Sequence, residues 1–263
     1  MTISRITAAG CLAVLLAAGT AHGQALYSNG PFVTHEGAHV SGADVSLAQD
    51  VTYPGYTALG YAAGPGWRLA DDFTVPVGKI WTITGARLFA FQPNVTAGFT
   101  DARVIIWLGV PDGPVSTKVF DGTVSNTLVD STPGPYRIAQ STEATAPFTN
   151  VARRVHVLGI AIPELVLESG NYWVDWQLTG GQSGQVYTPP VSIIGQPYTA
   201  LNGFARQKCP PDITSSDCPP SQWRLFINGS APYNVDLPFE LDGTSFDDSI
   251  FVGDFEEQED EDP

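Results

Sequence analysis

Short stretches of alternating apolar and polar residues, separated by glycine and proline, run along most of this chain. Its 263 residues include 27 glycines and 21 prolines, and no apolar stripe of period 3.6 lasts three helical turns. This pattern is typical of many short strands joined by turns, and the lack of intervening helices favours antiparallel pairing. The sequence therefore predicts an all-β fold, an antiparallel β-sandwich of jelly-roll type. The expected strands are 80–92, 103–108, 117–120, 136–139, 155–162, 171–178, 222–228 and 236–242.

Two of these stretches show which side chains the expected sheets bury. In 171–178 the period of two places Tyr172, Val174, Trp176 and Leu178 on one face, and Trp173, Asp175 and Gln177 on the other. In 236–242 it turns Leu237, Phe239 and Leu241 inward, while Pro238 lacks a ladder donor and indicates an edge strand. Both patterns predict a sandwich in which each sheet has one face in water.

The amino-terminal residues predict export. Arg5 is followed by an apolar stretch and then by the small residues Ala21 and Gly23, which is the layout of a cleaved signal peptide over 1–23. No stretch approaches the ~20 apolar residues that a membrane-spanning helix needs. We expect a mature protein that does not span a membrane and is secreted, extracellular or held at the cell surface, with the periplasm as an alternative.

Composition divides the mature chain into three parts. Residues 24–66 are expected to be a loosely structured lead-in with one or two short strands, and 67–242 a single sandwich domain. Residues 243–263 read as a linker and a disordered tail, because nine acids lie between Asp247 and Asp262. The formal net charge of −15 excludes nucleic acid as a partner, because an acidic chain repels phosphate.

Two cysteines, Cys209 and Cys218, remain after removal of the signal peptide. An even number in an exported chain indicates a disulfide. The two are nine residues apart, so we expect the bond to staple one loop.

The catalytic motifs in the sequence are incomplete. The stretch His35-Glu-Gly-Ala-His39 matches the H-E-x-x-H zinc pattern, but that pattern needs a helix. Gly37 weakens a helix there, and Val45 occupies the position of the third ligand in the longer metzincin form. The carboxylate pair of a glycosidase could come from Asp71, Asp72, Glu164, Glu168 and Asp175. A secreted hydrolase, glycosidase or zinc protease, stays an alternative, and no catalytic residue is assigned.

Two binding sites are expected from residue type. Trp173, Asp175 and Gln177 on one strand face could hold a sugar, because aromatic faces stack on sugar rings and carboxylates and amides bind hydroxyls. The alternative is that Trp173 packs under a loop or a second sheet. Asp71 and Asp72, with Asp44 and Asp50, could supply oxygen ligands to a structural calcium in loops. Turn-capping acids are the alternative, and no other cofactor is expected.

Four segments carry a resemblance to known sequences. They are the run from Leu69 to Gly85 (LADDFTVPVGKIWTITG), the segment from Phe89 to Gln92 (FAFQ), the strand from Gly170 to Gln177 (GNYWVDWQ) and the segment from Asp236 to Leu241 (DLPFEL). Across about residues 26–242 the chain resembles a family of uncharacterised exported bacterial β-sandwich proteins. The resemblance implies a jelly-roll-like surface or extracellular module, without an established activity. Residues 250–256 are similar to a short I-F-x-D/N-G-F-E tail of exported bacterial proteins, with Gly253 and Asp254 in swapped order.

These observations give one functional hypothesis and its alternative. The first is a secreted, non-enzymatic sandwich module that binds polysaccharide or other cell-surface components, or serves a structural role. The second is the secreted hydrolase.

Overall fold

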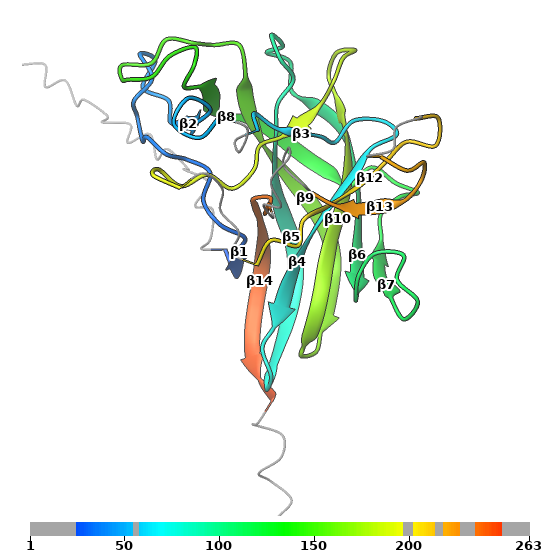
Figure 1. Ribbon diagram of the computed structural model, residues 1–263. Coiled ribbons are helices and arrows are strands. Elements are labelled where there is room, and N and C mark those ends of the chain that lie inside the picture. Colours follow the sequence, from blue (N-terminus) through cyan, green and yellow to red (C-terminus); the bar gives the residue numbers. More distant parts are fainter. Residues whose placement is uncertain (1–24, 55–57, 197–201, 214–217, 227–234, 249–263) are drawn as a thin grey trace, which may run out of the picture.

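The structure is a computed structural model that describes residues 25–54, 58–196, 202–213, 218–226 and 235–248. Two six-stranded sheets lie face to face, and the prediction of an all-β, antiparallel, jelly-roll-like sandwich is confirmed (Figure 1). Among the described strand pairs, only β2 with β8 is parallel.

The first sheet runs in the order β1 (Tyr27–Ser28), β14 (Phe239–Asp247), β5 (Lys79–Ala90), β9 (Arg154–Leu167), β8 (Leu128–Ala139), β2 (Val45–Ala48). The second runs β13 (Trp223–Leu225), β12 (Arg206–Lys208), β4 (Arg68–Val75), β10 (Gly170–Gly180), β6 (Phe99–Leu108), β7 (Thr117–Asp121). A small sheet pairs β11 (Tyr187–Thr188) with β3 (Tyr61–Ala62). The chain crosses between the large sheets several times, because β4, β6 and β10 lie in one sheet and β5, β8 and β9 in the other.

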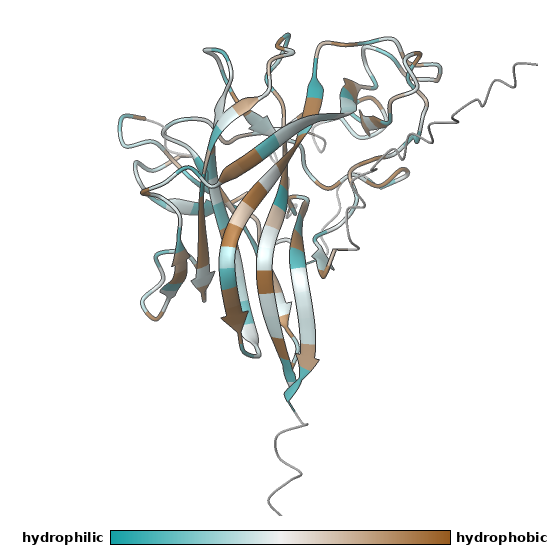
Figure 2. Ribbon diagram, turned by 180° about the vertical axis from the view of Figure 1, so that it is seen from behind, coloured by the Kyte–Doolittle hydropathy of each residue, from teal (hydrophilic) through white to brown (hydrophobic). Residues whose placement is uncertain are grey.

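The main core lies between the two sheets and follows the alternation of the sequence. The inward residues of β10, of β14 and of the segment before β14 are buried there as predicted, namely Tyr172, Val174, Trp176, Leu178, Leu237, Phe239 and Leu241. Figure 2 shows apolar and polar bands alternating along the strands. Burial of these side chains is the main source of stability, at roughly 25 cal/mol per Å² of apolar surface.

Several strands differ from the prediction: β4, β11 and β12 were not expected, and β8 begins at Leu128 and not at Tyr136. β4 was not expected, because its two adjacent acids, Asp71 and Asp72, interrupt the apolar pattern. β14 begins only at Phe239 and is not an edge strand, since Tyr27 and Ser28 pair with Leu241 and Glu240. Pro238, from which the edge strand was predicted, lies before β14 and so takes no part in its hydrogen-bond ladder.

The described part of the lead-in is integrated into the sandwich. It contributes β1, β2 and β3, whereas one or two short strands were expected. Val45 and Ala48 of β2 are fully buried, and β2 pairs with β8 over four residues. Loops that are rich in small residues can therefore still end in a packed strand when a neighbouring strand offers its edge.

The expectation of one wet face per sheet is wrong for the second sheet. Its outer face carries a cluster of its own, which consists of Ala70, Ile105, Trp107 and Trp173, with Trp223 packed against it. Large aromatic side chains on neighbouring strands cover one another there, and long cationic side chains lie over them.

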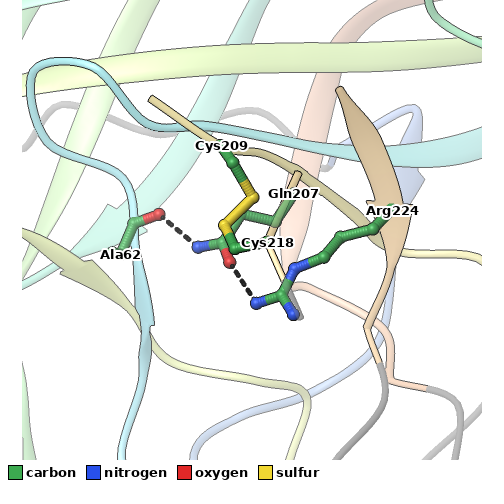
Figure 3. Close-up of a disulfide and its surroundings, with 5 residues drawn as sticks. All are labelled: Ala62, Gln207, Cys209, Cys218 and Arg224. Atoms are coloured by element: carbon green, nitrogen blue, oxygen red, sulfur yellow. Dashed lines mark hydrogen bonds between the residues drawn. A yellow bond between two sulfur atoms is a disulfide. The ribbon is translucent and has the colours of Figure 1, made fainter. Parts of the chain in front are cut away.

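The disulfide is confirmed between Cys209 and Cys218, with 5.7 Å between their Cα atoms. It joins the end of β12 to the residues before β13, beside Gln207 and Arg224 (Figure 3). Gln207 Nε2 donates to Ala62 O (3.0 Å) and Arg224 Nη2 donates to Gln207 Oε1 (3.1 Å). The bond therefore staples one loop to the edge of the second sheet, as expected.

Several predicted features lie outside the described residues. They are the signal peptide, the acidic tail beyond residue 248, and positions 227–228 of one predicted strand. Within the described residues, no helix has the length and apolar character needed to cross a membrane.

Candidate functional site

The residues predicted to bind a sugar lie together on β10, but their aromatic face is closed. Trp173 is 4% exposed and Asp175 is 1% exposed. The guanidinium of Arg206 lies 5.3 Å from the centre of the Trp173 ring, and half-buried Gln177 donates to Trp67 O (3.1 Å). These contacts correspond to the packing alternative and leave no open ring for a sugar.

Asp175 instead holds a buried ion pair. Its Oδ1 accepts a hydrogen bond from Arg68 Nε (2.6 Å) and its Oδ2 accepts one from Trp107 Nε1 (3.1 Å). Burial raises the pKa of the Asp175 carboxyl, and the charge of Arg68 opposes that rise. Asp175 therefore links three strands, β4, β6 and β10, across the outer face of the second sheet.

The acids predicted to bind calcium do not lie in a shared loop. Asp71 and Asp72 lie in β4, and Asp71 is fully buried. Asp71 Oδ2 accepts from Leu237 N (2.6 Å) and Asn29 Nδ2 (2.8 Å). These donors join the lead-in and the segment before β14 to the second sheet, so the carboxyl has a structural role that its position in the sequence does not reveal.

The other two acids of that prediction are engaged elsewhere. Asp44 Oδ1 accepts from Gly37 N (2.7 Å), and Asp50 Oδ1 accepts from Ser141 N (2.9 Å). No group of three or more His, Cys, Asp or Glu side chains in the described parts of the chain is arranged to hold a metal.

The burial of the Asp71 carboxyl leads us to predict that the free energy of unfolding depends on pH. Burial and the neighbouring charge of Asp236 raise its pKa well above 3.8. A raised folded-state pKa gives stability that is complete below the unfolded value and is lost as pH rises through the folded value. We therefore expect the free energy of unfolding of wild type to fall relative to Asp71→Asn as pH rises from 4 to 7, measured by urea denaturation.

Asp121→Asn is the control for this prediction. The Lys118 hydrogen bond lowers the pKa of Asp121 to about 2, so its contribution is lost only as pH falls toward 2. Its difference from wild type should be constant between pH 4 and 7. A constant difference for Asp71→Asn as well would contradict a raised Asp71 pKa.

The H-E-x-x-H stretch does not form the helix that its zinc pattern needs. His35 pairs with Val45 in a β-bridge and Gly37 has a φ of 59°, so residues 35–39 form a turn and not a helix. His39 Nδ1 lies 2.7 Å from Ser41 Oγ. The H-E-x-x-H pattern thus lacks the helical face on which its zinc chemistry depends.

The outer face of the first sheet carries a groove that was not predicted. Its floor is formed by outward side chains of β5, β9 and β14, and the lead-in residues Phe32 and Val33 form one wall. We call this surface the outer groove. Its floor residues are Arg87, Phe89, Val157 and Glu240. In the main core the inward neighbours Leu88 and Leu158 alternate with them, which places the floor on the outer side of the sheet.

Adjoining hollows make up the outer groove. A hollow of about 470 Å³ shares Arg87 and Val157 with one of about 330 Å³ on the β8 side. It shares Pro133 and Arg154 with one of about 610 Å³ at the other end. The hollows therefore follow one another along β8 and β9, as an extended ligand would require.

The floor of the outer groove combines apolar surface with fixed charges. Phe32 and Phe89 pack against each other with tilted rings whose centres are 4.5 Å apart. Arg87 Nε lies 3.0 Å from Glu240 Oε2, and its Nη2 donates to Asp242 Oδ1 (2.9 Å). This ion-pair cluster is partly exposed, so it presents oriented donors and acceptors to the solvent.

The function of the chain is inferred from this geometry, because the comparisons with known proteins found no protein family, curated protein or solved structure that matches it. Sequence reasoning missed the outer groove because its wall and floor come from segments around residues 32, 87, 157 and 240, which only the fold brings together. The alternation around Arg87 and Phe89 was the one available signal.

Proposed function

We propose that the protein is an exported, non-enzymatic module whose outer groove binds a carbohydrate chain. The single observation that carries the proposal is the row of adjoining hollows across the outer face of the first sheet. Each has a volume within the range of roughly 300–1,000 Å³ that is common for ligand sites.

The chemistry of the outer groove suits sugar rings. Sugars have apolar faces of C–H groups and rims of hydroxyls, so their sites combine apolar surface with a few oriented polar groups. Val33 and Val157, which are partly exposed, supply the apolar surface. Arg87, Glu240 and Asp242 supply donors and acceptors whose positions their mutual ion pairs already fix, which lowers the entropic cost of binding.

A substitution that fills the outer groove tests the proposal. Thr132 of β8 is exposed, pairs with Val157 and lines the groove. Thr132→Trp should abolish binding to polysaccharides on a glycan array and in pull-downs, because the indole occupies the space of the ligand. Tryptophan is well accepted on exposed strand positions, so the fold should be retained.

Thr74→Trp is the matched control. Thr74 is an equally exposed strand threonine on β4 of the second sheet, hydrogen-bonded to Asn171. It should bind as wild type does. The proposal would be contradicted if the Thr132→Trp variant bound glycans as strongly as wild type, or if wild type bound no glycan. Release of reducing ends from a bound polysaccharide would favour the hydrolase alternative.

A further inference from the structure

We propose that the outer groove selects sugars that carry an anionic group, a carboxylate or a sulfate ester, and that Arg154 binds that group. The inference rests on the proposed function and names the class of ligand. Arg154, the first residue of β9, lines both the hollow of about 470 Å³ and that of about 610 Å³. A group bound to Arg154 would therefore lie where the two hollows meet.

The two arginines of the outer groove differ in their partners. Arg87 is engaged by Glu240 and Asp242. Within the described residues, Arg154 forms no ion pair. Its Nε is buried without a hydrogen-bond acceptor, as is the Nε of Arg87, so the missing carboxylate partner is what distinguishes Arg154. Because Arg154 is partly exposed and its charge is unpaired, its guanidinium is the group in the groove with the most to gain from an anion.

The guanidinium of Arg154 is held in position by the ring of Tyr136. Its Cζ lies 4.4 Å from the centre of that ring, and His39 packs against Tyr136 with tilted rings whose centres are 4.2 Å apart. A guanidinium that lies on an aromatic face keeps its N–H donors directed outward along its edge. That edge matches the two oxygens of a carboxylate or sulfate, which arginine binds in bidentate fashion.

The acidic surroundings mean that an anionic sugar is selected by direct contact with Arg154 and not by the overall charge of the protein. Asp44 and Glu240 line the same hollow as Arg154, and the whole chain carries −15. General attraction of a polyanion is therefore unfavourable. At 0.15 M ionic strength exposed charges are screened over ~8 Å, so contact with Arg154 decides the interaction. We expect binding of the anionic sugar to persist at physiological salt.

Affinity electrophoresis of the full mature chain tests this inference. Native gels contain polygalacturonate, its methyl ester, chondroitin sulfate or neutral dextran. The proteins are wild type, Arg154→Gln, Arg154→Lys and Arg206→Gln. The last is the matched control, because Arg206 also lies over an aromatic ring but on the second sheet.

Wild type should be retarded by polygalacturonate or by chondroitin sulfate. Because chondroitin sulfate carries carboxylates as well as sulfate esters, retardation by polygalacturonate assigns the group as a carboxylate, and retardation by chondroitin sulfate alone assigns it as a sulfate ester. Arg154→Gln should weaken that binding by about tenfold or more, the loss expected for a hydrogen bond to a charged group. Arg154→Lys should lose less, and Arg206→Gln should match wild type.

Equal retardation by dextran and the anionic polymers, or an Arg154→Gln variant that binds as wild type, would overturn the inference. The inference would also be overturned if Arg154→Gln weakened binding to polygalacturonate and to its methyl ester by the same factor. In each of these cases binding that Thr132→Trp still abolishes would leave the proposed function standing. Absence of retardation by every polymer, together with an empty glycan array, would remove both.

Discussion

Replacing Arg137 by methionine is expected to lower the free energy of unfolding by about 3–5 kcal/mol. Arg137 is fully buried in β8, and four acceptors surround its guanidinium. Nε and Nη2 donate to Leu59 O (3.0 Å) and Ala58 O (2.7 Å). Nη1 donates to Ser46 Oγ and Ser192 Oγ, both at 2.8 Å. One side chain thus joins residues 58–59 of the lead-in, β2 and the loop after β11 to β8.

The physical reason for this large effect is the loss of donors to buried acceptors. Burial lowers the pKa of Arg137 to about 9, so the guanidinium is still charged at pH 7. A buried charge loses its favourable interactions with water, which costs free energy. The four hydrogen bonds offset that cost. Methionine fills the space of the aliphatic stem but leaves two carbonyls without donors, and each buried unsatisfied group costs about 1–3 kcal/mol.

Urea denaturation and thermal unfolding measure the effect of Arg137→Met. For a chain of this size, the expected loss corresponds to a decrease in Tm of about 10 °C. Arg103→Met is the control, because Arg103 is partly exposed and pairs with Asp101 on the surface of the second sheet. Such pairs contribute about 1 kcal/mol or less. A loss below 1 kcal/mol for Arg137→Met would show that this clamp does not hold the lead-in.

The second large effect is expected at Asp175. Asp175→Leu should cost about 3–5 kcal/mol, because it leaves the charge of Arg68 without its buried partner. It also removes the acceptor of Trp107 Nε1. Tryptophan fluorescence should report the change alongside denaturation, since Trp107 and Trp173 both belong to the cluster on the outer face of the second sheet.

A second substitution separates loss of the ion pair from loss of packing. Replacing Arg68 by methionine in the Asp175→Leu background removes the unpaired charge and fills the site with apolar atoms. Buried ion pairs replaced in this way are often as stable as the original. The double variant should therefore recover most of the loss, with a coupling measured by the double-mutant cycle. If it is no more stable than Asp175→Leu, the buried charge is not the cause.

The sequence predicted those parts of the fold that depend on local pattern. The alternation in 171–178 placed Tyr172 and Trp176 in the main core and Trp173 and Asp175 on the opposite face, and both placements are confirmed. The same pattern could not say that the opposite face would also be buried. That burial comes from neighbours on other strands, such as Trp107 opposite Trp173 and Arg206 above its ring.

Polar residues were the main source of error. Asp71 and Asp72 read as loop acids because charged residues rarely occur inside strands, yet Asp71 is buried in β4 with donors from residues 29 and 237. Arg137 carried no local signal at all, because its acceptors lie 55 to 91 residues away along the chain. The outer groove has the same origin. Register and sheet order assemble it from distant segments that have no motif of their own.

The most direct test of a carbohydrate site in the outer groove is a map of amide chemical shifts in the ¹⁵N-labelled mature chain. The chain would be titrated separately with a hexamer of galacturonic acid and with cellohexaose. The account predicts shifts on addition of the acidic hexamer at Arg87, Phe89, Arg154, Val157 and Glu240, with the second sheet unchanged. Shifts confined to the surroundings of Trp173 and Trp223, or no shift with either hexamer, would contradict it.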